Sequence, residues 1–135
     1  MLRFRFSFAG LRMRALGRLY RTNLLENTAQ ARGMRLLQSW LSAEQRAQFD
    51  SEGRFEVIGS DSGTRYRIRH GTSTNVDELD RVGNVVAGWC FVPLGGMVAG
   101  DVMLAQKIGL ETSERSTLAV ANKLPLLFPS RRDRL

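Results

Sequence analysis

The spacing of apolar residues predicts helices at both ends of the chain and strands in its middle. Between residues 22 and 41 the apolar positions recur at helical intervals, which predicts a helix with Trp40 as a core anchor. Gly33 falls in the middle of this stretch, where it can split the helix. Residues 42–45 read Ser-Ala-Glu-Gln, the pattern of a capping box. A second short helix should therefore begin there and end at Gly53, which completes a bent helical pair.

The middle of the chain alternates between strand-like and turn-like segments. The turn-like breaks are rich in Gly, Ser, Thr and Asp, and they are short enough to join antiparallel neighbours. We therefore expect a four-stranded antiparallel meander. Its strands are predicted at Phe55–Gly59, Arg65–His70, Val76–Asp80 and Val85–Val92.

Two further helices are predicted after the strands. Asp101 is expected to cap a helix that runs to about Glu111 and is apolar nearly all round, which is typical of a buried helix. A last helix is predicted at Glu114–Lys123. The fold class is thus α+β, with an N-terminal helical pair, a four-stranded meander and two C-terminal helices packed on the sheet. This domain is expected at residues 22–124, between a basic arm (residues 1–21) and a Pro-bracketed basic tail (residues 125–135).

The net charge of +7 lies entirely in the first 46 residues. That stretch holds nine arginines against two glutamates, whereas eleven basic residues balance eleven acids in residues 47–135. The chain therefore combines a basic N-terminal region with an electrically balanced remainder. Its single cysteine, Cys90, cannot form an internal disulfide, which is typical of a reducing compartment, so we expect a cytoplasmic location.

Residues 1–24 contain six arginines and no acid, and four interpretations fit such a segment. It is typical of an arm that contacts nucleic acid, here through Arg12, Arg14, Arg18 and Arg21. It also fits a basic segment on an anionic membrane surface, or a mitochondrial presequence. The plainest alternative is a tail without function, or a start codon placed upstream of the true one.

Arginine alternates with apolar residues in the second predicted strand. Strand geometry places Arg65, Arg67 and Arg69 on one face, about 7 Å apart. This spacing is near that of phosphates along a nucleic-acid strand, so it predicts a contact with nucleic acid or another acidic partner. The competing interpretation is an ordinary exposed sheet face whose arginines are neutralised from neighbouring strands by Glu56, Asp77 or Glu78.

Residues 124–129 read Leu-Pro-Leu-Leu-Phe-Pro, an apolar segment that contains two prolines. The segment could dock onto other protein subunits or onto its own domain through Leu124, Leu126, Leu127 and Phe128. No apolar run reaches the roughly 18 residues that span a bilayer, so no transmembrane segment is expected. The oligomeric state stays open.

The sequence offers little for catalysis or metal binding, and no catalytic residue, metal or cofactor is expected. His70 and Cys90 are the only residues of their types, which is too few for a zinc site. Cys90 lies in the most apolar predicted strand, where a thiol is inert. Glu111 and Glu114 could form an acid/base pair, but a solvated helix boundary explains them better.

One pattern resembles a known group of proteins. It comprises Tyr66-Arg-Ile-Arg-His-Gly71, Asn75-Val76, Leu79-Asp80, Cys90-Phe91 with Pro93, Gly100-Asp-Val-Met-Leu-Ala-Gln-Lys-Ile108, Leu110-Glu111 and Ala121-Asn122. It is similar to small uncharacterised bacterial and phage-borne proteins over about residues 40–123. That group has no assigned activity, so the resemblance implies a compact domain and leaves its function open.

These observations favour a non-enzymatic binding or structural subunit. It would contact nucleic acid, or an acidic surface of a larger assembly, through its basic arm. One alternative is a structural subunit of a protein assembly, such as a phage particle, that docks through its apolar tail without nucleic acid. A small enzyme of unknown reaction is the second alternative.

Overall fold

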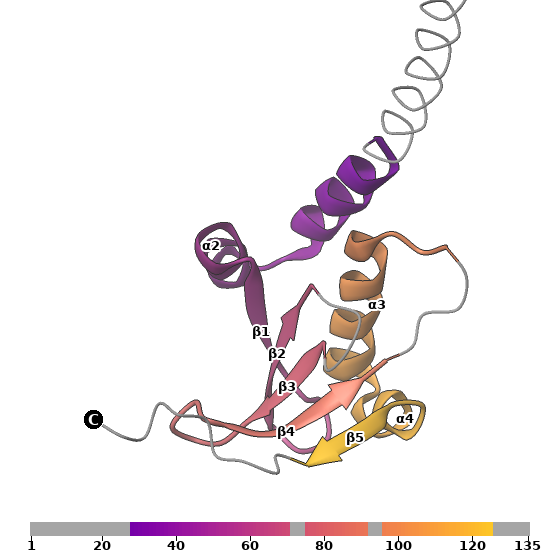
Figure 1. Cartoon of the computed structure of the whole chain (residues 1–135). Coiled ribbons are helices and arrows are strands. Elements are labelled where there is room, and N and C mark those ends of the chain that lie inside the picture. The colour runs from indigo at the N-terminus through magenta and orange to yellow at the C-terminus, as the bar shows by residue number, and fades with distance from the viewer. Residues whose placement is uncertain (1–27, 71–74, 92–95, 126–135) are drawn as a thin grey trace, which may run out of the picture.

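The computed structural model describes residues 28–70, 75–91 and 96–125, which form an α+β fold (Figure 1). Five described strands make one antiparallel sheet in the order β1-β2-β3-β4-β5, each beside the next in sequence. The predicted four-stranded meander is confirmed for β1 to β4, and the sheet has one strand more. The strands are β1 (Arg54–Ile58), β2 (Arg65–Arg69), β3 (Val76–Leu79), β4 (Val85–Cys90) and β5 (Asn122–Pro125).

Strand β5 replaces the end of a predicted helix. Helix α4 begins at Glu114 as expected but ends at Ala119, and residues 122–125 pair with β4 instead of continuing the helix. This pairing covers an edge of β4 that would otherwise be open. The Lys123 ammonium lies 5.2 Å from the centroid of the Trp89 ring, which adds a cation–π contact. Pro125, assigned to the tail from the sequence, is the last residue of β5.

Four helices are described: residues 28–40, α2 (Ala43–Glu52), α3 (Ala99–Thr112) and α4 (Glu114–Ala119). The capping box of α2 is confirmed, because Ser42 and Gln45 each accept a hydrogen bond from the other's backbone amide at 3.1 Å. Gly53 ends α2 in the left-handed conformation, with φ 69°. The prediction for α3 is wrong at its start, since Val98 occupies the cap and Asp101 lies in the first turn.

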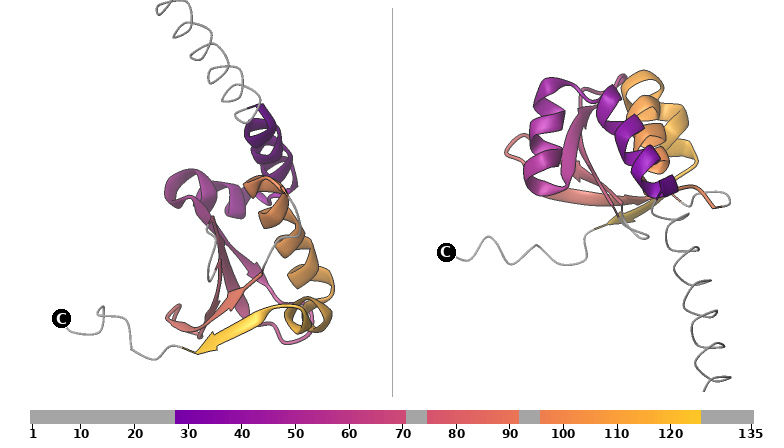
Figure 2. Two further views of the ribbon diagram at one scale, coloured as in Figure 1. Left: turned by 45° about the vertical axis from the view of Figure 1, so that its right-hand side comes forward. Right: turned by 90° about the horizontal axis from the view of Figure 1, so that it is seen from above.

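Helices flank the sheet on both sides, in place of the predicted stacking of the C-terminal pair on a four-stranded sheet (Figures 1 and 2). Helix α2 lies beside β1, the strand at one edge of the sheet, and α3 packs against β1 and β2. Gln45 and Gln48 of α2 both form hydrogen bonds with the backbone of Glu56 in β1. Gln48 accepts from the Glu56 amide at 2.9 Å, and Gln45 donates to the Glu56 carbonyl at 3.0 Å. Groups that an edge strand leaves unpaired are thereby satisfied.

The hydrophobic core lies between the sheet, α3 and helix 28–40. Its buried residues are Leu37, Phe55, Val57, Tyr66, Ile68, Val76, Met103, Leu104 and Leu110. The β1–β2 register sets Phe55 opposite Ile68 and Val57 opposite Tyr66, so alternate residues of both strands face the helices. Helix 28–40 is anchored by Leu37. The prediction for Trp40 is wrong, because its side chain is 57% exposed.

Helix 28–40 crosses the start of α3 at two glycines. A methyl group on Gly100 would overlap the backbone carbonyl of Gly33, and one on Gly33 would lie 2.6 Å from the side chain of Val98. The helix continues through Gly33 without a break. Glycine costs a helix about 1 kcal/mol, and the close crossing that it permits offsets that cost.

A buried carboxylate joins the β1–β2 turn to the start of α4. Glu114 is only 2% exposed and accepts four hydrogen bonds. The amides of Asp61 and Ser62 donate at 2.8 Å each, and the hydroxyls of Ser62 and Tyr66 donate at 2.5 and 2.6 Å. The prediction that Glu114 belongs to a solvated helix boundary is therefore wrong.

Other bonds follow the same seam between the turn and the helices. The Ser60 amide donates to the Leu110 carbonyl at 3.0 Å, and the Arg115 amide donates to the Asp61 carboxylate at 3.0 Å. A side chain on Gly59 would collide with the Glu114 carboxylate. The turn thus needs glycine at position 59 to let the carboxylate in.

The environment of Glu114 shifts two pKa values in opposite directions. Burial raises the pKa of the Glu114 carboxyl, but hydrogen bonds from Ser62, Tyr66 and the Asp61 amide outweigh it and lower the pKa from 4.5 to about 2. Burial, together with the bond to Glu114, raises the pKa of Tyr66 above its ordinary value. At neutral pH the contact therefore joins a charged carboxylate to a neutral phenol.

We predict that Gly100→Ala lowers the free energy of unfolding by about 2 kcal/mol, because the added methyl group forces two helices apart. Urea unfolding followed by circular dichroism measures the change. The matched control is Gly96→Ala, since nothing lies within 4 Å of a methyl group there. Equal stability of the two variants would show that the glycine crossing is not a tight contact.

We predict that Glu114→Ala lowers the free energy of unfolding at neutral pH by about 3 kcal/mol, because two turn amides and the Tyr66 hydroxyl lose their acceptor. Glu114→Gln should lose less, since its amide oxygen still accepts from the turn. Urea unfolding measures both, with the exposed neighbour Arg115→Ala as control. An alanine variant as stable as the wild type contradicts the assigned role.

The same carboxylate predicts a pH dependence. The folded pKa of Glu114 lies below its ordinary value of 4.5, so its stabilising effect is complete above that pH and is lost as the pH falls toward 2. The stability difference between wild type and Glu114→Gln should shrink across this window. A difference that stays constant from about pH 5 to about pH 2.5 would contradict the shift.

Candidate functional site

Strand β2 presents its arginines on one face of the sheet, as predicted. Burial alternates along the strand, because Tyr66 and Ile68 are buried while the arginines between them are half-buried. Arg67 lies opposite Glu56 on β1 and opposite Asp77 on β3. The register therefore brings acids from both neighbouring strands onto the arginine face.

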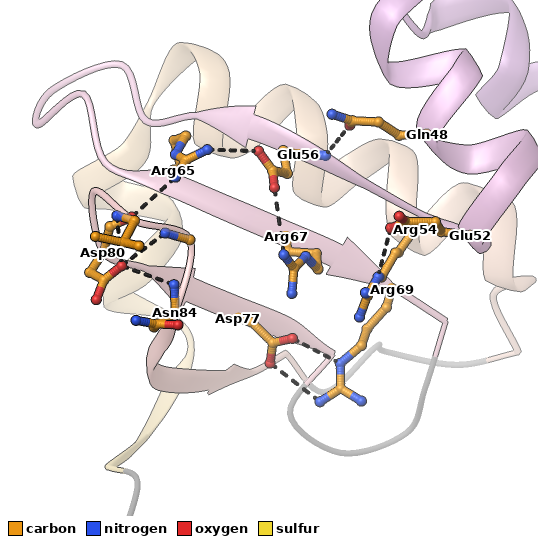
Figure 3. A network of polar contacts seen from close by, with 12 residues as sticks. Gln48, Glu52, Arg54, Glu56, Arg65, Arg67, Arg69, Asp77, Asp80 and Asn84 are labelled. Atoms are coloured by element: carbon orange, nitrogen blue, oxygen red, sulfur yellow. Dashed lines mark hydrogen bonds and ion pairs between the residues drawn. The ribbon is translucent and has the colours of Figure 1, made fainter. Parts of the chain in front are cut away.

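These acids neutralise the arginines of β2 (Figure 3). Glu56 serves two of them, since its carboxylate oxygens lie 3.4 Å from Arg65 and 3.6 Å from Arg67. Asp77 is buried and holds Arg69 at 3.3 Å. The competing interpretation of this face thus holds for Glu56 and Asp77. The interpretation is wrong for Glu78, because its carboxylate accepts a hydrogen bond from the Trp89 indole at 2.9 Å instead.

Further contacts occupy the same face. Arg65 donates to the carbonyls of Asp80 and Arg81 at 3.2 and 3.3 Å, and Arg54 pairs with Glu52 at 3.1 Å. The four arginines of this face meet three carboxylates. A phosphate or an acidic peptide would therefore have to compete with internal ion pairs for each guanidinium.

A second basic surface, which was not predicted from the sequence, lies on helix 28–40. At 100° per residue, Arg32, Arg35, Leu36, Ser39 and Trp40 cover a continuous arc of roughly 140°. We call these five residues the Arg–Trp surface. All five are exposed, because the opposite side of the helix packs through Gly33 and Leu37.

The arginines of the Arg–Trp surface differ in this respect from those of β2. Neither Arg32 nor Arg35 forms an ion pair with an acid in the described part of the chain. The sequence carried a signal for this, since no acidic residue occurs between Glu26 and Glu44. A helix without acids cannot pair its arginines at i+3 or i+4.

Most other predicted contact residues lie outside the described residues. This holds for Arg12, Arg14, Arg18 and Arg21 of the arm, and for Leu126, Leu127 and Phe128 of the tail. Leu124 is described and belongs to β5, opposite Gly88 of β4. Its backbone is committed to the sheet, so only its exposed side chain is available to a partner.

A polar cavity of about 640 Å³ lies between α2, β1 and α3. Its wall includes Lys107, a residue type that can act as a nucleophile. The Lys107 ammonium, however, is buried and pairs with Glu111 at 2.5 Å, and Gln45 donates to the other oxygen of Glu111 at 2.9 Å. These bonds tie α3 to α2, and they engage both charged groups of the wall in structural contacts.

The remaining candidate groups lie apart. His70 is exposed beyond the end of β2, and Cys90 is half-buried at the end of β4. Among the residues that the structure describes, no three His, Cys, Asp or Glu side chains are grouped so that they could hold a metal ion. None of the described helices has the length and apolar character to cross a membrane.

Comparisons of the chain with protein-family models, with curated proteins and with solved structures find no match. The resemblance of residues 40–123 to small bacterial and phage-borne proteins therefore stays a prediction.

Proposed function

We propose that the chain is a non-enzymatic binding subunit that contacts nucleic acid through the Arg–Trp surface and the basic arm. The observation that carries the proposal is a pair of exposed arginines, without an ion pair among the described residues, beside an exposed tryptophan on helix 28–40. Phosphates attract arginine through charge and the release of counterions.

The side chains beside the two arginines support a single-stranded ligand. Trp40 is 57% exposed and Leu36 is 47% exposed, although both are large and apolar. An exposed tryptophan next to arginine is the arrangement with which proteins stack an unpaired base and hold its phosphate. The helix presents both functions on one arc.

The distribution of charge supports the helix over the sheet as the main contact. The net charge of +7 comes from the first 46 residues, and Arg32, Arg35 and Arg46 from that stretch are exposed in the structure. The arginines of β2 are already engaged by Glu56 and Asp77. They would contribute only as a secondary contact.

A protein assembly without nucleic acid is the second candidate. Tryptophan and arginine are also the residues that dominate protein–protein interfaces. The Arg–Trp surface would then bind an acidic, apolar patch of another subunit, and the exposed Leu124 with the tail would dock beside it. An enzymatic function has no comparable support, since Lys107 and Glu111 are engaged with each other.

We predict that Arg32→Ala/Arg35→Ala weakens binding of a fluorescein-labelled single-stranded DNA of about 20 nucleotides by about tenfold, measured by fluorescence anisotropy with the full chain. The salt dependence should also fall, with the slope of log K against log salt changing by about 1.4. Trp40→Ala should weaken the single strand more than a duplex, because only unpaired bases can stack.

The matched control is Arg81→Ala/Arg115→Ala, which removes the same charge from two exposed sites elsewhere. It should change binding by about twofold at most. Replacing the four arm arginines (12, 14, 18 and 21) by alanine separates the arm from the helix. If the control double variant loses as much affinity as Arg32→Ala/Arg35→Ala, binding is non-specific attraction and the proposed surface is wrong. If proteins alone co-purify from nuclease-treated extracts at moderate salt, the assembly candidate replaces it.

We predict that Glu56→Gln leaves the affinity for single-stranded DNA unchanged within about twofold. This substitution frees Arg65 and Arg67 from their shared carboxylate. If the β2 face were the main contact, the freed arginines would tighten binding. The same anisotropy assay decides between the two surfaces, and tightening by about fivefold or more would move the contact to the sheet.

A further inference from the structure

The outer edge of β1 is bonded by helices at two points and is open between them. The N–H and C=O of a strand residue point to the same side, and successive residues alternate between the two sides. The backbone of Glu56 bonds two glutamines of α2, so it faces away from β2. The backbone of Ile58, two residues later, therefore faces the same way. The amide of Ser60 then donates to the Leu110 carbonyl of α3 at 3.0 Å, so Ile58 is the gap between the two helices.

This gap opens into the polar cavity of about 640 Å³ between α2, β1 and α3. Ile58 lines the cavity and is 62% exposed. In the described part of the chain, neither the amide nor the carbonyl of Ile58 has a hydrogen-bond partner, because Arg65 stands opposite it in a non-hydrogen-bonded pair. Open edge groups of this kind can pair with another extended chain. The gap is one residue long, so it accepts one residue of such a chain through two hydrogen bonds.

The charges of the wall indicate which part of a peptide fits. Among the described residues, five charged side chains line the cavity: Glu44, Glu56, Arg65, Lys107 and Glu111. Arg65 pairs with Glu56 at 3.4 Å, and Lys107 pairs with its own partner at 2.5 Å. Glu44 is exposed in the first turn of α2 and forms no ion pair with any described residue. The wall thus keeps one negative charge, which favours a cationic group such as the amino terminus of a peptide.

We propose that this cavity binds the amino-terminal end of an extended peptide. The second residue of the peptide pairs with Ile58, its N–H donating to the Ile58 carbonyl and its C=O accepting from the Ile58 amide. The amino terminus, one residue away, meets the Glu44 carboxylate. The cavity volume is within the roughly 300–1,000 Å³ range of ligand sites. The proposal is independent of nucleic-acid binding, since the cavity and the Arg–Trp surface share no residue.

The probe for the test is alanyl-valyl-alanine amide, which has a free amino terminus. Two matched peptides each lack one of the proposed contacts. The N-acetylated form has no charge at its amino terminus, and the form methylated on the valine nitrogen has no N–H to donate to Ile58. Each peptide is titrated into ¹⁵N-labelled full chain, and the backbone amide signal of Ile58 is followed by NMR. We expect a saturable shift with a Kd of about 1 mM for the probe, and binding about fivefold weaker or more for both matched peptides.

Two variants and one control make the test specific. Glu44→Gln should weaken the probe about fivefold and leave the acetylated peptide unchanged, because only the probe carries a charge for this carboxylate to bind. Ile58→Pro removes the edge N–H and should abolish binding, followed through the other amide signals of the cavity wall. Proline is tolerated where a strand N–H faces outward, and circular dichroism checks that this variant folds. The control Asp50→Asn removes the same charge from an exposed site of α2 outside the wall, and it should change nothing.

Three results would overturn the proposal. The first is hydrogen exchange at the Ile58 amide of the free protein as slow as at Val57, which pairs with β2, because the edge would then already be occupied. The second is the absence of a saturable shift up to about 10 mM probe, ten times the expected Kd. The third is equal binding of the probe and either matched peptide, or unchanged binding in Glu44→Gln, since one of the two proposed contacts would then be missing.

Discussion

The fold depends on one buried carboxylate. Glu114 starts α4, and its four hydrogen bonds hold the β1–β2 turn against the end of α3. A buried charge is tolerable only when its environment supplies donors for it, and here two turn amides and two hydroxyls do so. Because the turn and the helices are fixed together, the alternate residues of β1 and β2 meet α3 in a single register. The seam reaches the core through Tyr66 and Leu110.

The two edges of the sheet are covered by different elements. On one side, glutamines of α2 bond the backbone of β1, and at the far edge β5 pairs with β4. Helix 28–40 is held by Leu37 and by the glycine crossing with α3, which together use only one side of the helix. Its other side is therefore left to solvent with two arginines and a tryptophan. The same packing that secures the helix creates the surface proposed to bind nucleic acid.

Local sequence patterns predicted the elements that depend only on neighbouring residues. Alternation placed β1 to β4, and the Ser42 capping box placed the start of α2, because neither depends on distant residues. Most of the errors involve partners far apart in the chain. Glu114 is buried by a turn more than fifty residues earlier, and β5 forms because β4 offers an edge. Gly33 continues a helix because Gly100 lies across from it. The spacing of Trp40 predicts a core position, but the helix packs through Gly33 and Leu37 and leaves Trp40 exposed.

The two arginine surfaces show why a count of charges does not locate a binding site. The arginines of β2 gave the clearer sequence pattern, yet strand pairing brings acids to the same face, so Glu56 and Asp77 occupy them. Arg32 and Arg35 lie on a helix without acids, and neither forms an ion pair within the part of the chain that the structure describes. A partner engages the second pair at a lower free-energy cost, since no ion pair within the described residues has to be broken first. Available charge therefore depends on the acids that the fold brings close, and it points to the helix.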